Sequence, residues 1–186
     1  MYIGDNKTAL MSQQLIADAM IRLLGTYGYS DINVSMLCKE AQVSRQTFYT
    51  LFGNKENVLV YLLQNTCCYE PEKSTVCRSA DFRMLCRGYS HYIIEKREVL
   101  ALLVKNDMMH CLYDVQYESI MNCEHFMKEV TGDDRIYLID FIASGLNSIA
   151  RNYVRTGCHS DEDFLEKLMY RLFGGIYFYN RKETGD

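Results

Sequence analysis

The sequence predicts an all-α fold, and three observations support this prediction. The chain has 186 residues with a single proline, so little interrupts helix formation. Alternating runs of β-branched residues, which would indicate strands, are almost absent. Apolar residues instead recur at three- and four-residue spacing, in segments rich in Leu, Met, Ala, Lys and Glu. About nine helices are expected.

Four of these helices are expected before the linker. Asn33, Ser44 and Asn54 are candidate N-caps, because their side-chain oxygens can accept hydrogen bonds from the free N–H groups of a first helical turn. Gly53 breaks the chain before the last of the three caps. The expected helices span residues 8–27, 34–41, 45–51 and 54–69.

Five more helices are expected beyond Pro71, which together with its polar neighbours forms the only convincing linker. Acidic residues in the first turn of the last helix suit the positive end of its dipole. The first of these helices is marked by apolar residues within 82–93. The other four are expected at 98–104, at 107–130, from the turn at 131–134 to residue 157, and at 160–176. The chain is thereby divided into domains of residues 1–64 and 65–186.

Charge and cysteine usage limit the classes of protein. The net charge is −4. Residues 1–64 hold five acidic and five basic residues, so the whole negative net charge comes from the C-terminal part. DNA binding would therefore depend on placed cations rather than on bulk charge. Eight cysteines without a signal peptide or a membrane span indicate free thiols and a cytoplasmic location.

Two cations stand where a helix disfavours them. Arg45 follows the Ser44 cap and Lys55 follows the Asn54 cap, so each faces the positive end of a helix dipole. The dipole makes this placement unfavourable by a few tenths of a kcal/mol to about 1 kcal/mol. A bound phosphate would relieve the conflict, because dipole, free N–H groups and cation all attract an anion. Together with the tight turn between the helices of 34–41 and 45–51, the pattern predicts a DNA-binding helix-turn-helix.

The stretch LIADAMIRLLGTYGYSDINVSMLCKEAQVSRQTFYTLFGNKENVLVYL, residues 15–62, resembles the DNA-binding domain of the TetR family of transcriptional regulators. The matching features are Ala19, Leu23, Gly28-Tyr29, Val34, Leu37, Ala41, Val43-Ser44, Thr47-Phe48-Tyr49, Phe52 and Lys55-Glu56. The resemblance implies a ligand-responsive regulator, usually a repressor, that binds a palindromic operator as a homodimer. It also implies that the C-terminal domain holds the effector and the dimer interface.

The residues of the motif have expected roles. Arg45 and Lys55 are expected to neutralise phosphates. The resemblance assigns Thr47 and Tyr49 to the DNA backbone, while a packing role is the alternative for Tyr49. Asn33 and Ser44 are expected to act as caps whose helices offer N–H groups to phosphates.

Two positions depart from the family pattern. Gln42 stands where glycine is usual, so the turn must adopt its conformation without that freedom. Gln46 stands where a small residue is common. A long amide on the exposed face suits recognition of adenine N6 and N7 in the major groove, and a solvated surface glutamine is the alternative.

The C-terminal domain carries two weaker predictions. The first is an effector pocket lined by aromatic and methionine side chains, and an ordinary core is the alternative for the same residues. These residues are Met84, Tyr89, Tyr92, Met108, Tyr113, Tyr117 and Phe141. A dimer interface on the last two helices is the other. Its expected residues are Leu138, Ile142, Gly145, Ile149, Leu165, Leu168, Leu172 and Ile176. For Gly145, a crossing of helices within one chain is an equal alternative.

Other functions receive less support. No nucleophile elbow, P-loop, dinucleotide-binding glycine run or zinc motif is present, so no enzymatic activity, metal or cofactor is expected. A thiol-based redox switch remains an alternative, with Cys67, Cys68 and Cys77 near the linker as candidates. A helical protein-binding module without DNA function is the other alternative. The expected partners are double-stranded operator DNA, a second copy of the chain and an unknown small molecule, with no membrane.

Overall fold

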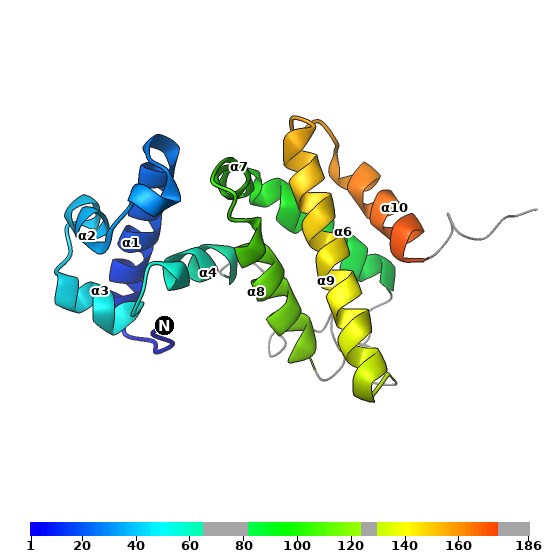
Figure 1. The fold of residues 1–186 in the computed structure, drawn as a ribbon, viewed down its shortest axis with the longest axis horizontal. Coiled ribbons are helices and arrows are strands. Elements are labelled where there is room, and N and C mark those ends of the chain that lie inside the picture. Colours follow the sequence, from blue (N-terminus) through cyan, green and yellow to red (C-terminus); the bar gives the residue numbers. More distant parts are fainter. Residues whose placement is uncertain (65–81, 124–129, 175–186) are drawn as a thin grey trace, which may run out of the picture. The chain divides into compact units, whose positions relative to one another are not determined.

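A computed structural model describes residues 1–64, 82–123 and 130–174 of the chain. Within these ranges the chain forms nine α-helices, one short 3₁₀ helix and no strand, which confirms the predicted all-α fold (Figure 1). The elements are α1 Lys7–Thr26, η1 Tyr29–Asp31, α2 Val34–Ala41, α3 Arg45–Leu51, α4 Glu56–Gln64, α6 Phe82–Glu95, α7 Arg97–Lys105, α8 Met109–Met121, α9 Gly132–Arg155 and α10 Glu162–Phe173. None of these helices is long and apolar enough to cross a membrane.

The described residues divide into two compact units. The first contains the N-terminal residues together with Glu98–Val115, and the second contains the remainder. Most of α7 and the first half of α8 therefore belong to the unit that holds the helix-turn-helix. A single division of the chain at residue 64 does not anticipate this contribution.

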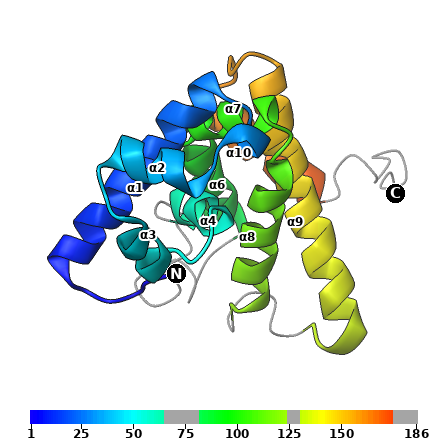
Figure 2. The same cartoon turned by 60° about the vertical axis from the view of Figure 1, so that its left-hand side comes forward.

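The N-terminal helices form where their caps and apolar stripes direct them. Asn33 accepts from the N–H of Met36 at 3.1 Å, and Ser44 accepts from the N–H of Thr47 at 2.9 Å, as the caps predict. The helices α1, α2, α3 and α4 pack around one core, visible from two directions in Figures 1 and 2. Its largest fully buried side chains include Ile16, Met20, Leu24, Leu37, Phe48, Phe52, Leu59 and Leu63.

The turn between α2 and α3 adopts a left-handed conformation. Gln42 has φ 55° and ψ 39°, and its N–H points back to the carbonyls of Cys38 and Lys39. This is the conformation for which the family pattern uses glycine. A side chain there costs about 1–2 kcal/mol relative to a right-handed residue, and the glutamine tolerates it.

The N-terminal segment is attached to the end of α3. The N–H of Tyr2 donates to the carbonyl of Leu51 at 2.7 Å, which satisfies one of the free carbonyls at the C-terminal end of that helix. The buried side chain of Gln13 donates to the carbonyl of Tyr2 at 3.1 Å. The first residues of the chain therefore lie beside α3.

In the second unit, α6 packs along α10. The buried carboxylate of Glu166 accepts from Arg83 and from Arg87, each at 2.9 Å, and these hydrogen bonds hold its pKa below the ordinary value. The core of this unit also contains Tyr89, whose hydroxyl donates to the carbonyl of Leu146 at 3.3 Å.

Some boundaries differ from the sequence analysis. The helix expected at 107–130 begins at Met109, because Asp107 takes a left-handed conformation with φ 57°. This helix ends at Met121. Residues 124–129 lie outside the described ranges. The first turn of α4 starts one residue after Lys55, although Asn54 still caps it through the N–H of Asn57 at 2.8 Å.

Candidate nucleic-acid interface

The faces of α3 are clearly divided. Phe48 and Leu51 are buried in the core, whereas Arg45, Gln46 and Tyr49 are exposed. The Tyr49 side chain is 56% exposed even though its ring makes an edge contact with Phe48, so it is not a core aromatic. Three of the residues expected to bind DNA thus share the open side of the helix.

The first turns of α2 and α3 are joined by a contact that the sequence analysis missed. The guanidinium of Arg45 donates to Oγ of Ser35 at 2.6 Å, and both side chains are exposed. Ser35 lies in the first turn of α2, two residues after the Asn33 cap. Two helix N-termini and one guanidinium therefore form a single site where an anion would be favoured. A periodic pattern gives no signal for such a contact, because it depends on the angle between the helices.

Thr47 is partly buried at the start of α3. Its hydroxyl shares a hydrogen bond of 2.8 Å with Oγ of Ser44, the residue that caps the helix. Both hydroxyls belong to the start of α3, as does Arg45, and the backbone contact implied for Thr47 stays a prediction.

Lys55 has a different environment from Arg45. Its ammonium donates to the carbonyls of Tyr29 and Ile32, both at 2.9 Å, and lies 4.1 Å from the centre of the Tyr29 ring. These interactions compensate for the unfavourable helix dipole without DNA, because carbonyl oxygens and an aromatic face both attract a cation. The phosphate contact of Lys55 stays a prediction, and the structure adds a structural role that the sequence analysis did not foresee.

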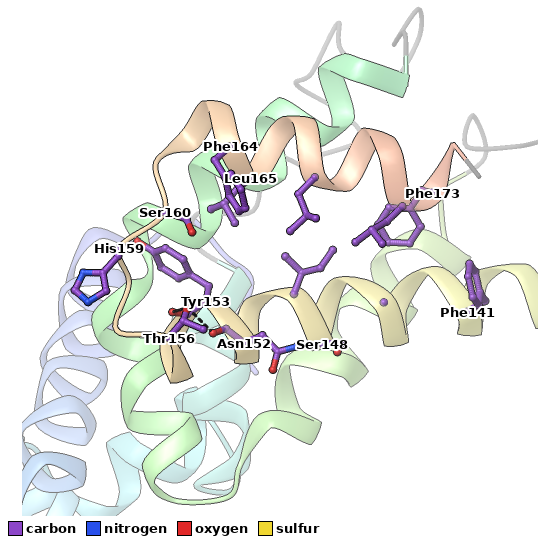
Figure 3. A pocket seen from close by; sticks show the side chains of 14 residues that line it. Phe141, Ser148, Asn152, Tyr153, Thr156, His159, Ser160, Phe164, Leu165 and Phe173 are labelled. Atoms are coloured by element: carbon purple, nitrogen blue, oxygen red, sulfur yellow. Dashed lines mark hydrogen bonds between the residues drawn. The ribbon is translucent and has the colours of Figure 1, made fainter. Parts of the chain in front are cut away.

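A groove of about 530 Å³ lies between α9 and α10 (Figure 3). One end is polar and contains Thr156, His159 and Ser160, while the other end contains Phe141 and Phe173. The Phe173 ring packs directly against Gly145, where an added Cβ would lie 2.9 Å from the ring. Gly145 therefore permits a close contact within one chain.

The residues expected at the dimer interface gather at this groove. Gly145, Ile149, Leu165, Leu168 and Leu172 line it. Leu138 and Ile142 are half-buried on α9, and Ile176 lies outside the described residues. Around them the structure exposes aromatic side chains that the sequence analysis did not assign to an interface: Tyr137 is 75% exposed, Phe141 63% and Phe164 48%.

The residues expected to line an effector pocket differ in burial and belong to both compact units. Tyr89 and Tyr92 are buried and stacked, with ring centres 5.6 Å apart, and the amide of Gln116 donates to the Tyr89 hydroxyl. Phe141 is instead an exposed residue of the groove. The others are buried Met108, half-buried Tyr113 and Tyr117, and Met84, whose side chain lies outside the described part of the structure. The effector pocket stays a prediction.

The cysteines in the described part of the chain are mostly core residues. Cys38, Cys86, Cys111 and Cys123 are buried and form no disulfide, and Cys158 is partly exposed. Burial raises the pKa of the Cys111 thiol to about 11, with smaller contributions from Asp114 and Glu56, so it stays protonated and unreactive near neutral pH. The redox candidates Cys67, Cys68 and Cys77 lie outside the described residues.

The fold and the exposed motif define a helix-turn-helix DNA-binding protein with a helical second domain. Residues 16–62 match the sequence model of the bacterial regulatory proteins of the tetR family. The dhaKLM operon transcriptional activator DhaS of Lactococcus lactis subsp. lactis (strain IL1403) is 30% identical over 120 residues, which span 64% of this chain and 56% of the relative. The N-terminal part of the chain is therefore similar to the DNA-binding region of the tetR family, and the chain spans about half the length of the relative that it matches.

Solved structures show the same fold. Lin0861 of Listeria innocua superposes with a TM-score of 0.78, at 17% identity, over 95% of this chain and 96% of that one. FadR of Thermus thermophilus, a TetR family repressor in complex with lauroyl-CoA, superposes with a TM-score of 0.54, at 18% identity, over 94% of this chain and the whole of the other. Both show that the all-helical fold of this chain also occurs in solved structures.

Proposed function

We propose that this protein is a sequence-specific DNA-binding regulator of transcription that acts as a homodimer on a palindromic operator. The observation that carries the proposal is the exposed site formed by the first turns of α2 and α3. There, Arg45 bridges to Ser35 while Gln46 and Tyr49 point away from the core. Arg45, Thr47, Tyr49 and Lys55 hold the DNA backbone together with the N–H groups beyond Asn33 and Ser44, and Gln46 reads a base edge.

Two copies of the chain pair through the α9–α10 groove. The groove and the exposed Tyr137, Phe141 and Phe164 place apolar side chains on α9 and α10 where a second copy of the chain could cover them. A two-fold axis would cover the same surface on both copies, which a palindromic operator requires. Light scattering at micromolar concentration should give twice the chain mass of 21.7 kDa. A monomer would remove both the dimer and the palindrome.

Selection of duplexes from a random library by the purified protein tests DNA recognition. Enrichment of a two-fold symmetric motif, with half-sites about one helical turn apart or slightly more, is expected. The Gln46→Ala variant serves as the matched control, since it should lose preference at one base pair of each half-site. No enrichment above scrambled duplex at moderate salt would favour the protein-binding module.

The protein responds to a small molecule bound in its second domain. FadR of Thermus thermophilus, which has the same fold, is a repressor in complex with lauroyl-CoA, and this supports a small-molecule effector for the present protein. An effector must bind the DNA-incompetent state more tightly to release the operator, with a coupling free energy of about 1–3 kcal/mol. A thermal-shift screen of small molecules with and without operator tests this, because an effector should stabilise the free protein and lose affinity when DNA is bound.

We propose repression as the direction of regulation, and activation is the second candidate. FadR is a repressor, whereas DhaS, matched at 30% identity, is an activator. A reporter gene whose promoter overlaps the selected operator distinguishes them. Repression predicts higher expression when the gene for this protein is deleted, and activation predicts lower expression.

A further inference from the structure

The corner between α7 and α8 lies in the same compact unit as the helix-turn-helix and contacts two backbone groups of its N-terminal part. The ammonium of Lys105 donates to the carbonyl of Gly25 at 2.9 Å, in the last turn of α1. The side-chain oxygen of Asn106 accepts from the N–H of Tyr29 at 2.9 Å, where η1 begins. Both are groups that a helix end leaves without an internal partner. The corner therefore caps the exit of α1 and the start of η1.

The Asn106 amide is itself fixed. Its Nδ2 donates to the carbonyl of Leu102 at 2.9 Å, so both ends of the amide are bound. The following Asp107 is left-handed, and the N–H of Met108 donates to the carbonyl of Leu103 at 2.8 Å. A side chain held in this way presents its oxygen in one position rather than adapting to Tyr29.

Tyr29 is the residue that the corner and α4 share. Lys55, directly before α4, binds the carbonyls of Tyr29 and Ile32 and covers the Tyr29 ring. The Tyr29 hydroxyl is buried, and burial followed by the nearby Glu56 carboxylate raises its pKa. Backbone, ring and hydroxyl of Tyr29 are thus all enclosed, so displacement of its N–H would also displace the binding site of Lys55.

The same contacts continue to the proposed DNA site. Ile32, whose carbonyl Lys55 binds, precedes the Asn33 cap of α2. The first turn of α2 carries Ser35, which binds Arg45 of α3. The path from Asn106 to Arg45 runs through Tyr29, Lys55, Ile32 and Ser35, and each of its steps is a hydrogen bond or a short run of bonded residues.

We propose that Asn106, supported by Lys105, is a positioning residue for DNA binding. It holds η1 and the start of α2 in the arrangement that brings the first turns of α2 and α3 to the same DNA backbone. The inference rests on the proposed function and adds residues more than forty positions beyond the helix-turn-helix to the set that determines operator affinity. They act through backbone groups and make no contact with DNA.

The test replaces Asn106 with leucine, which has similar size and no acceptor. The Tyr29 N–H then lacks its partner, and operator affinity should fall about tenfold, because η1 and the start of α2 leave the DNA-competent arrangement in about nine of ten free molecules. Affinity for a scrambled duplex at low salt should fall less, because it depends mainly on charge. Asn106→Asp retains an oxygen acceptor for the Tyr29 N–H but loses the N–H that donates to the Leu102 carbonyl, so its affinity should fall less than that of Asn106→Leu. Asn122→Leu, at the exposed end of α8, is the matched control.

All titrations are made at 10 °C with helicity checked by circular dichroism, so that a loss of stability alone does not change them. The inference would be overturned if Asn106→Leu bound the operator as tightly as the unchanged protein. It would also be overturned if Asn106→Asp lost as much operator affinity as Asn106→Leu. If Asn106→Leu lacks native helicity, Lys105→Ala decides, with a two- to fivefold loss expected for its single exposed contact and no loss overturning the inference. Failure of the unchanged protein to prefer operator would instead contradict the proposed function.

Discussion

The first turn of α3 and the start of α4 contain the same sequence pattern, a cation directly after a capping residue, but they resolve it differently. Arg45 is exposed and has one hydroxyl partner, Ser35. Lys55 is half-buried and binds two carbonyls and an aromatic ring. A misplaced cation can therefore be available to an external anion or already be neutralised within the fold. The pattern alone cannot distinguish the two.

The largest expected effect tests the buried half of this comparison. Lys55→Ala leaves two part-buried carbonyls without their charged donor, and the free energy of unfolding should fall by about 2–3 kcal/mol. Urea denaturation followed by circular dichroism measures it, with Lys39→Ala, an exposed lysine of α2, as the control. A loss below about 0.5 kcal/mol would show that the cation is not structural.

The same Lys55→Ala variant also tests the phosphate contact. If the ammonium neutralises a phosphate as well, the dependence of operator affinity on salt should flatten by about one unit. An unchanged salt slope together with a large loss of stability would assign Lys55 to the fold alone.

Gln46→Ala should have the next largest effect, on recognition rather than stability. Loss of a bidentate amide contact should remove about 1–3 kcal/mol of discrimination at one base pair per half-site, with the salt slope kept. Anisotropy titrations on operator and on duplexes substituted at each position measure this. An equal loss on operator and scrambled duplex would make Gln46 a solvated surface residue.

Arg45→Ala should weaken binding to operator and scrambled duplex alike and flatten the salt slope by about one unit. Because the side chain is exposed and has a single neutral partner, the free energy of unfolding should change by less than about 0.5 kcal/mol. Ser35→Ala is the companion variant, since it frees the guanidinium without removing it. A large loss of stability in Arg45→Ala would erase the difference between the two cations.

The smallest effect concerns the turn that leads to Arg45. Gln42→Gly removes the left-handed strain of a residue with a side chain, and the greater freedom of glycine in the unfolded chain offsets part of the gain. The net gain should be at most about 1 kcal/mol, seen as a raised urea midpoint. A lowered midpoint would mean that the glutamine side chain contributes contacts that outweigh the strain.

The sequence was sufficient for the features that depend on neighbouring residues. The Asn33 and Ser44 caps, the all-α fold and the exposed face of α3 are determined within one or two helical turns, so spacing reveals them. The contact between Tyr29 and Asn106 joins positions 77 residues apart and has no periodic signature. It could be found only from the three-dimensional arrangement.

The effector pocket shows a different limit. Aromatic and methionine side chains at helical spacing suit a core as well as a cavity, because both require an apolar face. Tyr89 and Tyr92 prove to be stacked and buried, whereas Phe141 is exposed at the α9–α10 groove. Whether such a residue lines a pocket depends on the packing between helices, which residue types do not specify.

The attachment of the N-terminal segment has a practical consequence for measurements on this protein. Because Tyr2 is bonded to the last turn of α3, a purification tag fused ahead of Met1 would emerge beside the helix that carries Arg45, Gln46 and Tyr49. At a pH of about 6.5 or below, the protonated imidazoles of a histidine-rich tag would bring positive charge toward the DNA and raise the apparent salt slope. Removing the tag before the titrations avoids this artefact.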